Sequence, residues 1–146
     1  MKIKKLHVLL VGIQFVGIFI FLFTGRIFPQ HWPQALLMLL SLFVGFWAIF
    51  SMNRQTLTVL PDARPNATLT TSGPYKFIRH PMYTAVLLLL TALLVNDFSE
   101  VRMLVLVAVT VVLILKINIE EKILRVKYPE YADYMKTTRK IIPYLF

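Results

Sequence analysis

The chain has 146 residues, of which 58% are hydrophobic and 16% charged, and its formal net charge is +9. Soluble domains average about 45–50% apolar and about 25% charged residues, so this composition predicts a single membrane domain over residues 1–146. The absence of cysteine excludes a disulfide framework and a thiol nucleophile, and three well-separated histidines, His7, His31 and His80, predict no metal site.

Four apolar runs predict helices at about residues 6–23, 35–52, 81–96 and 100–127, followed by a C-terminal tail over residues 128–146. The first run is 18 residues long, and as a helix it spans about 27 Å, close to the roughly 30 Å of a bilayer core. A signal peptide also begins this way, but the length of the run and the later apolar runs favour a transmembrane helix. We therefore expect an all-α integral membrane protein with about four transmembrane helices.

Local signals mark where these helices begin. Pro33 and Pro81 suit the first turns of the second and third helices, and Ser99 is a candidate N-cap for the fourth. The third run spans only about 22 Å, so it crosses a bilayer only if flanking residues extend it. Residues 129–136 predict a short amphipathic helix in the tail, with its tyrosines on one face.

The positive charges predict the orientation of the chain. Fourteen of the 16 Lys and Arg residues lie in the first five residues, in the long connection over residues 53–80, or from Lys116 onwards. The other two connections contain only Arg26 and Arg102, so the positive-inside rule places both termini and the long connection in the cytoplasm. This distribution explains the net charge without nucleic acid. We expect a multi-pass protein of a prokaryotic inner membrane, with membrane lipids as partners.

Residues 70–83 combine turn formers, aromatic residues, two cations and a histidine. Gly73-Pro74 indicates either a tight turn or a close approach to a ligand. Pro81 would open a helix whose first N–H groups are unpaired, and His80 and Tyr83 would share a face. Arg79 adds a permanent cation; the alternative for it is snorkelling to the lipid headgroups.

Glu120 and Glu121 follow the fourth apolar run. If the third and fourth helices form an antiparallel hairpin, these carboxylates lie close to His80. Polar groups at membrane depth indicate function by default. The alternative is a pair of i,i+4 ion pairs within one helix, Lys116 with Glu120 and Glu121 with Arg125. Adjacent glutamates point to different faces of a helix, which disfavours paired-carboxylate chemistry.

Residues 73–83 resemble the Gly-Pro-Tyr-x-x-x-Arg-His-Pro-x-Tyr signature of integral-membrane methyltransferases, which include isoprenylcysteine carboxyl methyltransferases and phospholipid N-methyltransferases. The C-terminal pattern of that group is paired glutamates, then tyrosines, then Ile-Pro. Here the matching residues are Glu120, Glu121, Leu124, Tyr128, Tyr131, Tyr134, Ile142 and Pro143. The resemblance covers residues 69–143, about half of the chain.

This resemblance implies S-adenosyl-L-methionine as cofactor. Its pocket is expected on the cytoplasmic side, built from the long connection, the start of the third helix, the exit of the fourth and the tail. The implied cofactor-binding residues are Tyr75, His80, Pro81, Tyr83, Glu120 and Glu121. Arg79 and Glu121 are expected to be catalytic. A glutamate suits the cofactor's ammonium, a cation or helix N-terminus its carboxylate, and a tyrosine ring its sulfonium.

The expected activity is methyl transfer to a lipophilic acceptor that enters from the bilayer, with O-methylation of a carboxylate favoured, as in isoprenylcysteine carboxyl methyltransferases. Methylation of a phospholipid amine or of a small thiol is an alternative. Two further alternatives are an NADPH-dependent reductase of the sterol type, which resembles this group at its C-terminal end, and a non-enzymatic membrane protein with a basic, lipid-binding face.

Overall fold

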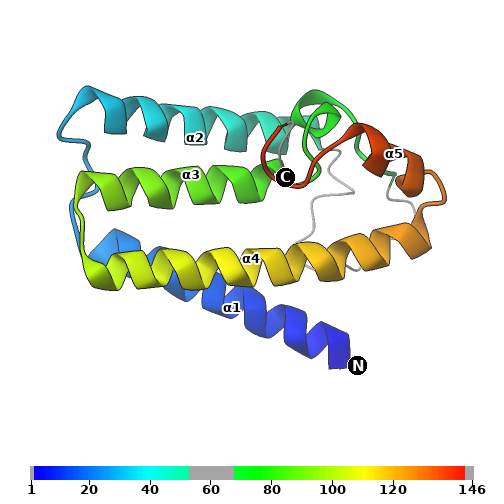
Figure 1. Cartoon of the computed structure of the whole chain (residues 1–146), viewed down its shortest axis with the longest axis horizontal. Coiled ribbons are helices and arrows are strands. Elements are labelled where there is room, and N and C mark those ends of the chain that lie inside the picture. The colour runs from blue at the N-terminus through cyan, green and yellow to red at the C-terminus, as the bar shows by residue number, and fades with distance from the viewer. Residues whose placement is uncertain (1, 53–67, 144–146) are drawn as a thin grey trace.

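The computed structural model describes residues 2–52 and 68–143 and has the expected all-α fold (Figure 1). No strand occurs among these residues. The elements in chain order are α1 (Lys2–Phe23), α2 (Trp32–Ser51), the 3-10 helix η1 (Gly73–Lys76), α3 (Pro81–Asn96), α4 (Glu100–Lys127) and α5 (Tyr131–Thr137). The long connection can be followed only from Thr68, so the predicted contribution of residues 53–67 to a pocket lies outside the described residues.

Helices α1, α2 and α4 are long and apolar enough to cross a membrane, with mean hydropathies of 2.5, 2.0 and 2.3 over their most apolar windows. Large apolar side chains on α1 and α2 are exposed, among them Phe19, Leu39, Phe43 and Phe50. In an integral membrane protein such side chains face lipid. Helix α3 is apolar but has only 16 residues, about 24 Å by helical rise, so a fourth complete span stays a prediction.

The helix ends follow from local chemistry. Pro33 is the second residue of α2 and Pro81 the first of α3, both places where a missing N–H is tolerated. Ser99 is the N-cap of α4 by backbone geometry, although its side chain makes no capping hydrogen bond. At the far end, Pro129 disfavours helical backbone at the preceding residue, and Tyr128 is extended, with φ −119° and ψ 107°. Helix α1 begins at Lys2, earlier than the apolar run alone predicts.

The helices pack as two pairs, α2 against α3 and α1 against α4, and α3 joins the pairs (Figure 1). The α1–α2 and α3–α4 connections lie together at one end of the bundle, which we call the loop end. η1, α5 and the start of α1 lie at the other, which we call the tail end. The apolar core between the pairs contains Phe21, Leu90, Leu93, Leu94, Val109 and Leu113.

Contacts along α1 and α4 define an antiparallel register. Near the loop end, the Arg102 guanidinium lies 4.7 Å from the centre of the Phe21 ring. In the middle, Gly17 permits close approach, since a Cβ built there would lie 2.4 Å from Cγ2 of Val109. Toward the tail end, Lys116 of α4 contacts Gln14 of α1. The register therefore brings the first residues of α1 next to the last turns of α4.

Arg102 links α1 to the α3–α4 connection at the loop end. It is only 1% exposed, and its guanidinium donates hydrogen bonds to the backbone carbonyls of Phe21, at 3.2 Å, and Asp97. We expect Arg102→Met to lower thermal stability in detergent, because the buried carbonyl of Phe21 loses its donor at a cost of about 1–3 kcal/mol, and the part-buried carbonyl of Asp97 loses one as well. The loss should appear in thermal unfolding, while Arg26→Met, an exposed cation at the same end, should leave the midpoint nearly unchanged. Equal midpoints for both variants would contradict this structural role.

Candidate functional site

The tail end is organised by η1, where the chain turns toward α3. Gly73 has φ +59°, a conformation that favours glycine, and a Cβ there would lie 2.0 Å from Oγ of Ser51 and 3.1 Å from Nε1 of Trp47. The space beside Gly73 is therefore filled by α2. Of the two interpretations of Gly73-Pro74, the structure favours the turn that packs against a helix over the close approach to a ligand.

The C-terminal tail returns to this turn and pairs with it through the backbone. Ile78 and Arg139 form an isolated parallel bridge. The N–H of Arg79 donates to the carbonyl of Arg139 at 2.7 Å, and the N–H of His80 donates to that of Lys140 at 3.0 Å. One turn into α3, the hydroxyl of Thr84 donates to the carbonyl of Ile141 at 2.8 Å. These bonds hold Arg79 and His80 where α3 begins.

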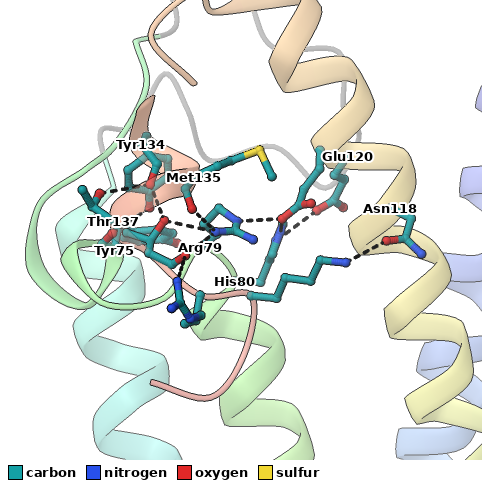
Figure 2. Close-up of polar contacts among 12 residues, drawn as sticks. Tyr75, Arg79, His80, Asn118, Glu120, Tyr134, Met135 and Thr137 are labelled. Carbon is teal, nitrogen blue, oxygen red and sulfur yellow. Dashed lines mark hydrogen bonds and ion pairs between the residues drawn. The ribbon is translucent and has the colours of Figure 1, made fainter. Parts of the chain in front are cut away.

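Arg79 points inward and joins three parts of the chain (Figure 2). Its Nε donates to Oε1 of Glu121 at 2.7 Å, and its Nη1 donates to the carbonyls of Thr138 at 2.6 Å and Met135 at 3.3 Å. The Arg79 and Glu121 side chains are only 7% and 6% exposed. Arg79 is thus a buried ion-pair partner, which rules out snorkelling. Glu121 pairs across the bundle with Arg79, where the helical alternative predicts Arg125.

His80 lies between the two glutamates. Its Nδ1 is 3.6 Å from Oε2 of Glu120, and its Nε2 is 3.5 Å from Oε1 of Glu121. Its ring stacks on that of Tyr83, with centroids 5.6 Å apart and planes 8° apart. His80 is buried, and its Nε2 has no hydrogen-bond partner of good geometry among the described residues. Although adjacent glutamates were expected to diverge, here both converge on one imidazole.

Glu120 is the more accessible carboxylate, with its side chain 20% exposed. Its Oε1 accepts a hydrogen bond from the hydroxyl of Tyr83 and lies 3.7 Å from Nε2 of His7, a buried residue of α1. No Lys or Arg of the described residues lies within ion-pair distance of Glu120. Its negative charge is therefore balanced less directly than that of Glu121, which Arg79 neutralises.

A second polar contact lies one helical turn deeper. Nζ of Lys116 donates to Oε1 of Gln14 at 2.7 Å and lies 4.8 Å from the centre of the Tyr83 ring. Lys116 and Gln14 are both buried, at 4% and 8% exposure. The polar cluster thus extends from the tail end into the span through Lys116.

Three tyrosines of the motifs pack beside the cluster on its tail side. The hydroxyl of Tyr134 donates to the backbone carbonyl of Tyr75 at 2.6 Å, which links α5 to η1 (Figure 2). The ring of Tyr131 meets that of Tyr134 edge-on at 5.7 Å. Tyr131 is buried, and its hydroxyl has no hydrogen-bond partner among the described residues. Burial raises the pKa of Tyr134 to about 12, so its hydroxyl remains a donor at neutral pH.

The predicted site residues therefore meet at one end of the bundle, in two groups. Five of them, Arg79, His80, Tyr83, Glu120 and Glu121, belong to the polar cluster. Tyr75 contributes its buried ring and its carbonyl, and Pro81 contributes the buried first turn of α3.

Other members of the cluster were not predicted. Thr138 accepts from Arg79 through its hydroxyl at 3.2 Å and its backbone carbonyl at 2.6 Å, and the carbonyl contact leaves no trace in sequence. His7 and Gln14 belong to α1, and their signal was present, because they are the two polar side chains in an otherwise apolar run.

The cluster suits the polar groups of an amino-acid ligand. Glu120 offers a carboxylate that lacks a Lys or Arg partner among the described residues, and two buried polar atoms, Nε2 of His80 and the hydroxyl of Tyr131, have unused hydrogen-bonding capacity. A surface hollow of about 260 Å³ lies between the end of η1 and the tail. It is lined by Lys76, Phe77, Lys136, Thr137, Arg139 and Pro143, none of which belongs to the cluster. The predicted cofactor pocket as a defined cavity stays a prediction.

Two comparisons place these features among known proteins. The family model described as phospholipid methyltransferase matches residues 29–131, a range that includes η1, α3 and α4 but not α1. The cobalt-zinc-cadmium resistance protein CzcN of Cupriavidus metallidurans is 30% identical over 115 residues, which cover 78% of this chain and 52% of CzcN. The chain spans about half the length of this curated relative.

Proposed function

This chain belongs to the phospholipid methyltransferase family, and we propose that it transfers a methyl group from S-adenosyl-L-methionine to a lipophilic acceptor drawn from the bilayer. The observation that carries this proposal is the convergence of the two motifs on one buried imidazole, His80, with the Glu120 carboxylate beside it. The cluster lies at one end of membrane-crossing helices, where a polar donor from water and an apolar acceptor from lipid can meet.

Within this proposal Glu120 and Glu121 have different roles. Glu120 is the partner of the cofactor's ammonium, because it is the more exposed carboxylate and has no Lys or Arg in ion-pair contact among the described residues. Glu121 and Arg79 form a buried pair that positions His80 and holds the tail. Both were expected to be catalytic; their mutual contact at 2.7 Å favours a positioning role.

His80 and Tyr131 are the proposed partners of the remaining polar groups of the cofactor, since each has an unsatisfied buried atom. When bound, S-adenosyl-L-methionine would supply an electrophilic methyl group on a sulfonium. The chain's own contribution is to orient the donor through these contacts and to keep water away from the reacting atoms, which suits a displacement that needs alignment.

A carboxylate is the acceptor group that we favour, as in isoprenylcysteine carboxyl methyltransferases. A carboxylate attacks without losing a proton, whereas an amine must first be deprotonated by a base. Glu121 is paired with Arg79, and Glu120 and His80 are assigned to the donor, which supports an acceptor that needs no base. We further propose that the tail end faces the cytoplasm of a prokaryotic inner membrane, as the distribution of Lys and Arg supports.

Binding of the donor is tested by thermal unfolding of the detergent-solubilised protein with S-adenosylhomocysteine or NADPH. A ligand at 100 times its dissociation constant stabilises the folded state by about 2.7 kcal/mol, so a specific ligand raises the unfolding midpoint clearly. We expect S-adenosylhomocysteine to raise it and NADPH to leave it unchanged. Stabilisation by NADPH alone would instead support a reductase, and no effect of either ligand would support a non-enzymatic protein.

The acceptor is identified by incubating membranes that contain the protein with methyl-labelled S-adenosyl-L-methionine and a lipid extract. We expect label in the organic phase, in a base-labile methyl ester. Label in a base-stable headgroup amine would identify N-methylation instead. The Glu120→Gln variant serves as the background control, because it keeps the shape of the side chain and removes its charge.

A further inference from the structure

We propose that α1 contributes to ligand binding: Gln14 and His7 act with Lys116 to position Glu120 for the ammonium of the methyl donor. This inference rests on the proposed function. Helix α1 lies outside the residues that match the family model, so the match does not predict this role. The role is inferred from the contacts of the two buried polar side chains of α1.

The first step is the environment of Lys116. A lysine at membrane depth is costly unless it is well paired. Its contacts here are an amide oxygen, Oε1 of Gln14 at 2.7 Å, and the face of the Tyr83 ring, 4.8 Å from its centre. Both contacts are specific in direction, and a cation over an aromatic ring is attracted most strongly where water is excluded. Gln14 therefore holds the ammonium of Lys116 where it can fix the Tyr83 ring.

The second step leads from the ring to the carboxylate. The hydroxyl of Tyr83 donates to Oε1 of Glu120, and Nε2 of His7 approaches the same oxygen at 3.7 Å. Oε2 of Glu120 instead faces Nδ1 of His80 at 3.6 Å. One carboxylate oxygen is thus held by α1 and α3, while the other faces the imidazole between the motifs. We assign Oε2 as the oxygen that receives the donor's ammonium.

The third step is electrostatic. Lys116 lies one helical turn before Glu120 on α4, so its charge stabilises ionised Glu120 without occupying Oε2. An ionised carboxylate with one oxygen fixed and the other available is preorganised for a cation. Removing Lys116 both releases the Tyr83 ring and weakens this stabilisation, so Lys116 acts on the ligand through Glu120 and is a positioning residue.

The test compares two ligands that differ only in the amine. Affinities of S-adenosylhomocysteine and of its deaminated analogue, which keeps the carboxylate, are measured by calorimetry for the intact chain and for Lys116→Met, Gln14→Leu and Lys116→Arg. Lys116→Met and Gln14→Leu should weaken S-adenosylhomocysteine about tenfold and leave the deaminated analogue within about twofold. Lys116→Arg, which retains a cation able to lie on a ring, should restore most of the affinity.

A matched control is Thr110→Val on the same helix, whose hydroxyl donates within α4, to the carbonyl of Leu106 at 2.8 Å. It should leave both affinities unchanged. Equal losses of affinity for the two ligands in Lys116→Met would show that Lys116 only supports the fold. Unchanged affinity for both ligands would show that α1 is an anchor. Both results overturn the inference. If the unmodified chain binds neither ligand, the proposed function itself is wrong.

Discussion

Replacing Arg79 with methionine is expected to lower the free energy of unfolding by about 3–5 kcal/mol, the range for breaking a buried ion pair from one side. The variant leaves the Glu121 carboxylate, 6% exposed, without the guanidinium that now lies 2.7 Å away. It also removes the donor to the carbonyls of Thr138 and Met135, so the tail loses a side-chain contact as well. Unfolding in detergent, followed by circular dichroism at several denaturant concentrations, measures the loss.

Adding a second substitution separates the effect of the unpaired Glu121 charge from the effect of lost packing around Arg79. Arg79→Met with Glu121→Leu removes both charges of the buried pair, so we expect much of the stability to return. Donor binding should not return, because His80 has lost the carboxylate beside its Nε2. The control is Lys136→Met, which breaks the exposed pair with Asp133, and exposed pairs contribute little. A loss in Arg79→Met no larger than in Lys136→Met would disprove a structural role for the buried pair.

Replacing Glu120 with glutamine is expected to have the opposite profile, with a large effect on binding and a small one on stability. The glutamine keeps the shape of the side chain and an oxygen that accepts from the hydroxyl of Tyr83. It loses the charge that we assign to the donor's ammonium. A hydrogen bond to a charged group contributes about 1.5–3 kcal/mol, and each 1.4 kcal/mol is tenfold in affinity, so S-adenosylhomocysteine should bind about 10- to 150-fold more weakly.

Calorimetric titration of the purified protein measures this affinity, and Glu100→Gln is the matched control. Glu100 is exposed in the first turn of α4, at the opposite end of the same helix. Its substitution should leave the affinity unchanged. An identical affinity in Glu120→Gln would show that Glu120 is not part of the binding site. A strong loss of stability in that variant would mean that Glu120, like Glu121, has a structural role.

Much of the helical framework was predictable because its signals are local. Pro81 and Ser99 mark the starts of α3 and α4, and Pro129 marks where α4 ends, since proline restricts the residue before it. The start of α1 was less predictable. Lys2, Lys4 and Lys5 are charged, yet they continue the helix beyond the apolar run.

The members of the site were more predictable than their pairing. Sequence spacing suggested that Glu121 pairs with Arg125, four residues along the same helix, but burial at the start of α3 gives Arg79 the stronger need for a carboxylate. The tail contacts were not predictable, since the carbonyls of Thr138, Arg139 and Lys140 accept hydrogen bonds whatever their side chains are. A backbone acceptor has no signature in the sequence.

The return of the tail to the start of α3 also bears on how the protein is made. Arg79 and Thr138 are 59 residues apart, so the ribosome completes α3 and α4 before the backbone carbonyls that accept from Arg79 have been synthesised. During that interval the helices can enter the bilayer while the guanidinium and His80 still lack the backbone contacts that fix them. Completion of these contacts therefore requires residues 138–140, which follow the membrane-crossing helices in the chain.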